Sequence, residues 1–172
     1  MKRSFPFLLL TGMGLLSVAS ATAQEPSTAT ATFVDANGNE IGNATATETP
    51  SGVLLDLSVD GLPKATWVAV HIHENGECDP ASAHDSAGGH FNPAGRSHGY
   101  FSPGGPHAGD LPNQHVQPNG ELRAEIFNHL ITLDGPDDGI RSRALVIHAD
   151  ADDYESQPSG NAGRRLACAV IE

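Results

Sequence analysis

Residues 53–73 read VLLDLSVDGLPKATWVAVHIH, and their alternation of apolar and polar residues indicates the class of fold. Polar residues interrupt the apolar run over 53–59, a turn follows at Gly61-Leu62-Pro63, and a second run, WVAVHIH, covers 67–73. Alternation with a period of two is typical of β-strands, because successive side chains point to opposite faces of a sheet. The stretch therefore predicts strands separated by a turn.

The same pattern continues on both sides, and helical periodicity is absent. Further strands are expected at 29–34, 41–47, 123–127, 130–133, 144–148 and 166–171, with turn sequences at 35–39 and 118–120. About eight short strands without helices predict an all-β antiparallel sandwich or barrel. Two connections, 74–112 and 149–164, are much longer than ordinary turns and are predicted to be functional loops.

The N-terminus has the pattern of a secretory signal. Lys2 and Arg3 precede an apolar run over 5–18, and small residues fill 19–23. This predicts a signal peptide at 1–23, cut after Ala23, because the run is too short for a transmembrane anchor. One domain, 24–172, would remain, in a protein exported to the periplasm or the extracellular space.

The net charge limits the possible partners, and the cysteines are consistent with export. The formal net charge is −12, which argues against nucleic acid and anionic membranes as partners. Cys78 and Cys168 are the two cysteines, and an even pair in an exported chain predicts a disulfide, with two buried thiols as the alternative. Closing a loop of this length contributes about 4 kcal/mol in the chain-entropy model.

Nine histidines are present, and several have the spacing of metal ligands. His71 and His73 flank Ile72 near the end of a predicted strand, so both imidazoles point to one face and could bind one metal. His148 ends another predicted strand, where a hydrogen-bonded core histidine is the simpler interpretation.

The long loop contains GHFNPAGRSHGYFSPGGPHAGD at 89–110. Its glycines and prolines exclude a helix or a regular ladder. His90, His98, His107 and Asp110 supply three imidazoles and one carboxylate, which complete a tetrahedral zinc shell. A bound ion would then act as the core of the loop; the alternative is a solvated polar loop.

The number of candidate ligands suggests two sites that share one residue. Two four-ligand sites need about eight ligands, and the sequence offers one fewer. Only histidine has two nitrogens on opposite sides of a ring, so one imidazole could serve both metals. Spacing alone does not identify it. The candidates are His71, His73, His90, His98, His107, Asp110 and His148.

Together, these motifs resemble the copper/zinc superoxide dismutases. The matching segments are HIH at 71–73, GGHFNP at 88–93, VIHADADD at 146–153 and GNAGRRLACAVI at 160–171. Two features resemble the bacterial exported branch: the long segment between Cys78 and His90, and a second loop without lysine. The resemblance implies an eight-stranded Greek-key β-barrel with two long functional loops, and it allows a homodimer.

The resemblance also implies an activity, cofactors and residue roles. Superoxide would be converted to dioxygen and hydrogen peroxide by alternating reduction and oxidation of one copper per chain, beside one structural zinc. His90 would bridge the metals, Cys78 and Cys168 would form the family's disulfide, and Arg165 would be the active-site arginine. The implied copper ligands are His71, His73, His90 and His148; the implied zinc ligands are His90, His98, His107 and Asp110. Asp152 would accept hydrogen bonds from His71 and His98.

Some features lie outside this pattern. His84, His115 and His129 match no ligand position and are expected at the surface. An exported metal-sequestering protein on the same fold, without dismutase activity, is the main alternative. A cupin fits less well, because the glycines expected before His71 and after Glu77 are missing.

Overall fold

β-Strands dominate residues 25–172, which are the residues that this computed structural model describes. The predicted signal peptide at 1–23 lies outside them. The long strands are β1 (Thr28–Asp35), β2 (Glu40–Thr49), β3 (Gly52–Val59), β5 (Val70–His73), β7 (Leu122–Asn128), β8 (Ala144–His148) and β9 (Arg165–Val170). Two-residue strands β4 (Trp67–Val68) and β6 (Gln114–His115) and the 3₁₀ helices η1 (Pro80–Ser82) and η2 (Asp85–Ala87) complete the elements.

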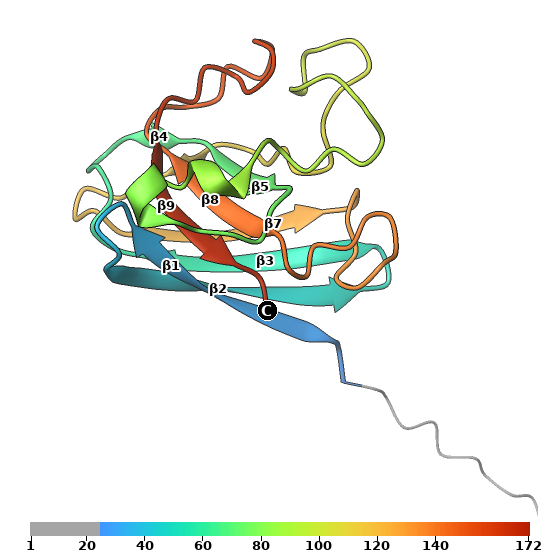
Figure 1. Ribbon diagram of the computed structural model, residues 1–172, viewed down its shortest axis with the longest axis horizontal. Coiled ribbons are helices and arrows are strands. Elements are labelled where there is room, and N and C mark those ends of the chain that lie inside the picture. The colour runs from blue at the N-terminus through green and yellow to red at the C-terminus, as the bar shows by residue number, and fades with distance from the viewer. Residues whose placement is uncertain (1–24) are drawn as a thin grey trace, which may run out of the picture.

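Seven strands form one curled antiparallel sheet in the order β5-β8-β9-β1-β2-β3-β7 (Figure 1). β4 and β6 make a separate antiparallel pair. Strand β1 lies between β9 and β2, so the two ends of the domain are neighbours in the sheet. This arrangement confirms the predicted all-β antiparallel fold.

The core follows from the alternation in the sequence. In β3 the side chains of Val53, Leu55, Leu57 and Val59 are fully buried, whereas Asp56 between them is exposed. The large β3 residues face small ones on the neighbouring strand, since Ala44 and Ala46 of β2 pair with Leu57 and Leu55. Large and small side chains therefore lie side by side on this buried face, an alternation that allows close packing.

Two strand predictions need correction. Residues 67–73 are not one strand, because the chain changes partner at Ala69: Val68 pairs with Gln114, whereas Val70 pairs with Ile147. The strand expected at 130–133 is absent from the described sheet; its backbone is held by turn bonds, including Thr132 N–H to Asp138 O at 3.1 Å. Ile131 and Leu133 of that segment are nevertheless buried.

Both predicted long loops are present and rise from the same end of the sheet (Figure 1). We call residues 74–113 the first loop and residues 149–164 the second loop. The first loop carries η1 and η2, and its start is held by a disulfide between Cys78 and Cys168, with a Cα–Cα distance of 5.6 Å. Within residues 25–172, no helix has the length and apolar character needed to cross a membrane.

Candidate metal centre

The candidate ligands come together where β5, β8 and the first loop meet. Two groups can be distinguished, and within each the ligand atoms lie within 4.8 Å of one another. All the residues involved are buried, and His90 belongs to both groups. The first group, which we call the four-histidine group, consists of His71, His73, His90 and His148; the second, the three-histidine group, consists of His90, His98, His107 and Asp110.

Backbone pairing explains how the first loop reaches β5. Isolated bridges join His71 to Asp110 and His73 to His90. Between them, Ile72 N–H donates to Gly109 O, and Ile72 O accepts from Phe91 N–H, both at 2.8 Å. A Cβ at Gly109 would overlap Ile72 O, so only glycine allows this approach. On its other side, β5 pairs with β8, which ends at His148.

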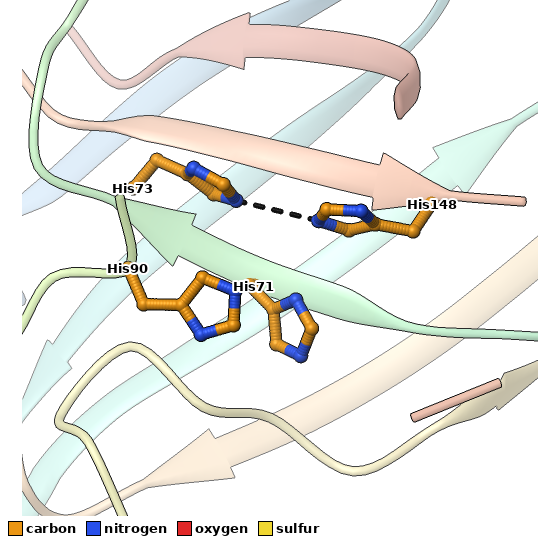
Figure 2. Close-up of side chains that lie close together, drawn as sticks. All are labelled: His71, His73, His90 and His148. Atoms are coloured by element: carbon orange, nitrogen blue, oxygen red, sulfur yellow. Dashed lines mark hydrogen bonds between the residues drawn. The ribbon is translucent and has the colours of Figure 1, made fainter. Parts of the chain in front are cut away.

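The rings of the four-histidine group turn one nitrogen of each toward the others (Figure 2). The opposite nitrogens contact oxygens outside the group: His71 Nε2 lies 2.8 Å from Asp152 Oδ2, and His73 Nδ1 lies 2.9 Å from Gly88 O. His148 Nδ1 similarly lies 3.3 Å from Gly163 O. The outer nitrogens of His71, His73 and His148 therefore carry the hydrogen, which leaves a lone pair on the inner nitrogen of each ring.

Two inner nitrogens of the four-histidine group have no hydrogen-bond partner although they are buried. His71 Nδ1 and His90 Nε2 are both in this condition. An unpaired buried polar group costs about 1–3 kcal/mol, so these nitrogens are poorly accommodated unless a cation binds them. All-imidazole coordination suits copper, and the four-histidine group therefore fits this metal.

The three-histidine group is built around one carboxylate oxygen. Asp110 Oδ1 lies 2.8 Å from His90 Nδ1, 3.0 Å from His98 Nδ1 and 3.3 Å from His107 Nδ1. Asp110 Oδ2 instead accepts backbone hydrogen bonds from Gly99 and His107. Three imidazole nitrogens and one carboxylate oxygen form the donor set of a closed tetrahedral zinc site.

Asp152 joins the two groups from the second loop. Its Oδ2 contacts His71 Nε2 at 2.8 Å, and its Oδ1 contacts His98 Nε2 at 3.0 Å. One carboxylate thus accepts a hydrogen bond from a ring of each group, which fixes both tautomers. Gly160 lies directly over this contact, since a Cβ there would overlap Asp152 Oδ1.

Without bound metal, the pKa values of the histidines differ between the two groups. Burial lowers the pKa of His73 to about 2, of His148 to about 3 and of His90 to about 4, helped by neighbouring histidines. These rings are therefore neutral lone-pair donors at neutral pH. For His98, burial opposes protonation, but the carboxylates of Asp110 and Asp152 outweigh it and raise the pKa to about 9.

Arg165 stands at the edge of a pocket that opens onto the four-histidine group. The pocket measures about 420 Å³ and is lined by His73, His90, His148 and Arg165, among others. Arg165 Nη1 donates to His84 O and Nη2 donates to Gly88 O, both at 2.6 Å. The guanidinium is consequently held in place by backbone carbonyls.

The three histidines that match no ligand position, His84, His115 and His129, differ in how far they are buried. His84 was expected at the surface, but this prediction is wrong: its side chain is fully buried and its backbone is left-handed, with φ 64°. Nearby, Ala87 of the first loop packs in a buried cluster with Val146 of β8 and Cys168 of β9. His115 is half-buried against Trp67, with ring centroids 5.1 Å apart, and His129 is exposed.

Several functional contacts have no signature in the sequence. The carbonyls of Gly88 and Gly163 orient ring nitrogens, and the carbonyl of His84 holds Arg165. Any residue type supplies a backbone carbonyl, so only the fold reveals these contacts. Asn113 and Gln157 also bridge the two loops, and sequence analysis did not single them out.

Comparison with known proteins agrees with this geometry. Residues 40–171 match the family model described as Copper/zinc superoxide dismutase (SODC). A Cu-Zn superoxide dismutase of Aquifex aeolicus is 45% identical over 162 residues, which cover 92% of this chain and 94% of that protein.

Two solved structures are similar in fold. The SOD-like protein from Bacillus subtilis gives a TM-score of 0.77 at 34% identity, over 81% of this chain and 95% of the other. The Cu/Zn superoxide dismutase from Brucella abortus gives 0.70 at 25% identity, over 85% and 100% of the two chains. The chain therefore belongs to the copper/zinc superoxide dismutase family.

Proposed function

We propose that this protein is an enzyme that converts superoxide to dioxygen and hydrogen peroxide. The observation that carries the proposal is the placement of His90, whose Nε2 faces the four-histidine group while its Nδ1 lies 2.8 Å from Asp110. Copper would be held by His71, His73, His90 and His148, and zinc by His90, His98, His107 and Asp110. Family membership and the names of the relatives support this assignment.

Copper bound at the four-histidine group would supply one-electron redox chemistry, and zinc bound at the other group would supply a fixed positive charge. The protein's own part is to position groups and to move a proton. His90 Nε2 is buried and without a hydrogen-bond partner, so its lone pair is available either to copper or to a proton, and the protonated ring could donate that proton to the product. Asp110 and zinc would hold the opposite side of this ring in place.

Arg165 would bind and orient the substrate. The net charge of −12 repels an anion, but the substrate meets the local field of the pocket. In the pocket, a hydrogen bond to Gly88 O holds the Arg165 guanidinium in the same lining as His73 and His148. A cationic cleft in a negative surface focuses the field and raises association rates by about 10–10³-fold, and a charge-assisted hydrogen bond would hold superoxide close to the rings.

The test combines metal analysis with a superoxide-consumption assay on purified protein. We expect one copper and one zinc per chain, rapid consumption of superoxide, and loss of both metals in His90→Ala. His107→Ala should lose zinc and retain copper. Equimolar metals without activity would instead favour the metal-sequestering alternative.

Export and assembly are further parts of the proposal. The disulfide between Cys78 and Cys168 fits an oxidising compartment, which agrees with a signal peptide at 1–23. N-terminal sequencing of the exported protein should begin at Gln24. The homodimer that the family resemblance allows stays a prediction, and sedimentation analysis of the metal-loaded protein would test it.

A further inference from the structure

A side-chain amide of the second loop holds the backbone of a residue in the first loop. Gln157 Oε1 accepts a hydrogen bond from His98 N–H at 2.9 Å, and Gln157 Nε2 donates to His98 O, also at 2.9 Å. The same Nε2 contacts Ser102 Oγ at 3.1 Å and Glu155 O at 3.0 Å. Gln157 therefore occupies both backbone polar groups of His98.

The reverse contact is made by an amide of the first loop. Asn113 Oδ1 accepts from Asp152 N–H, and Asn113 Nδ2 donates to Asp152 O, both at 2.8 Å. Asn113 thus holds Asp152 of the second loop in the way that Gln157 holds His98 of the first. We call Asn113 and Gln157 the amide clamps.

The two clamped residues contact each other directly. His98 Nε2 lies 3.0 Å from Asp152 Oδ1, and both side chains are fully buried. The surrounding backbone is also closely packed, since Phe101 N–H donates to Tyr154 O at 3.0 Å. Each partner of the central hydrogen bond consequently has its backbone fixed by a side chain from the opposite loop.

We infer that Gln157 and Asn113 are positioning residues that set the His98–Asp152 geometry and thereby the affinity for zinc. The inference rests on the proposed function, which makes His98 a zinc ligand. His98 Nδ1 lies 3.0 Å from Asp110 Oδ1. We expect the ring to keep this orientation only while the backbone and Nε2 of His98 are both held. Partners that orient a metal-binding histidine typically contribute 10–100-fold to metal affinity.

The two clamps act on one hydrogen bond, so their effects should not multiply. Loss of either amide alone leaves one partner of the His98–Asp152 hydrogen bond free to shift. Loss of the second amide should then weaken zinc binding little further. Gln157 also precedes Pro158 and Ser159, which line the pocket beside Arg165. The clamp therefore fixes part of the pocket wall along with the zinc ligand.

The decisive measurement is the zinc affinity of copper-free protein in competition with a chelator. Gln157→Met, which keeps size but removes both polar atoms, should weaken zinc binding about 10–100-fold. Asn113→Leu should weaken it to a similar extent, and the double variant should lose less than the product of the single losses. Copper affinity in Gln157→Met should change less than about threefold, because Asn113 still holds Asp152, the hydrogen-bond partner of the copper ligand His71.

A spectroscopic readout separates positioning from general stability. In metal-free protein the His98 Nε2–H, bonded to Asp152, should exchange slowly with water by ¹H NMR and should exchange at least tenfold faster in Gln157→Met. Gln157→Glu, which keeps the acceptor and loses the donor, should give an intermediate loss of zinc affinity and serves if the Met variant does not fold. Gln117→Met, at an exposed position, is the matched control and should change neither quantity.

Zinc affinity within threefold of wild type in Gln157→Met, or multiplicative losses in the double variant, would overturn the inference. Wild-type protein that binds no zinc tightly would refute the proposed function itself. The two failures are therefore distinguishable.

Discussion

His73 Nε2 lies 3.3 Å from His148 Nε2, across the neighbouring strands β5 and β8. The other nitrogen of each ring faces a backbone carbonyl, that of Gly88 or of Gly163. Both hydrogens are therefore directed outward, and two lone pairs face each other in a buried space. Such an arrangement is unfavourable without a cation, which makes the stability of the protein depend on its metals.

Metal removal should lower the melting temperature by about 10 °C or more. A ligand at about 1,000 times its Kd stabilises the folded state by about 4 kcal/mol, and each kcal/mol corresponds to about 2–4 °C in a domain of this size. Calorimetry of loaded and chelator-stripped protein measures the difference, and adding back zinc and copper should restore it. Equal melting temperatures would argue against metal binding at the two groups.

Arg165→Ala should lower kcat/KM for superoxide about 10–100-fold and flatten its dependence on ionic strength, because the local cation that attracts the anion is lost. Arg165→Lys should restore part of the salt dependence but less of the rate, since lysine cannot engage two carbonyls and the substrate with one fixed fork. Arg141→Ala is the control, because Arg141 pairs with Asp134 at a surface site. A rate and salt slope unchanged in Arg165→Ala would remove this residue from the active site.

Gly160→Ala should weaken zinc binding at least tenfold. The added Cβ would overlap Asp152 Oδ1 and lie 2.7 Å from His98 Nε2, so the central hydrogen bond must break or lengthen. Gly61→Ala is the matched control: its φ of 73° resembles the 67° of Gly160, but a Cβ there meets nothing within 4 Å. It should cost only the strain of left-handed backbone, roughly 1–2 kcal/mol, and leave zinc affinity unchanged.

The metal-free protein should lose stability as the pH rises through about 9. Asp110 and Asp152 raise the pKa of His98 from 6.5 to about 9 against the effect of burial. Because the folded-state pKa is raised, this contribution is fully present below pH 6.5 and disappears as His98 deprotonates. Chemical denaturation of stripped protein at pH 6.5 and 9.5 checks this, with His98→Gln as the comparison. A difference of the same size in that variant would exclude His98 as the cause.

The sequence predicted most strands because their alternation reflects which face is buried. Residues 53–59 and 144–148 lie in strands close to the expected bounds. The strand predictions for 67–73 and 130–133 were wrong, because hydrogen-bond partners rather than the side-chain pattern determine the backbone structure there. The surface position predicted for His84 was also wrong, because its burial depends on where the first loop folds.

The all-β architecture, the two long loops and the set of candidate ligands could be predicted from the amino-acid sequence, because these follow from local periodicity and from residue chemistry. Three other features are visible only in the folded chain: which nitrogen of each ring faces inward, the contact of the His90 ring with both groups, and the hydrogen bonds by which Asn113 and Gln157 hold Asp152 and His98. These relationships join segments up to about 80 residues apart and often use backbone carbonyls, and loop closure in three dimensions is what brings such groups within hydrogen-bonding distance.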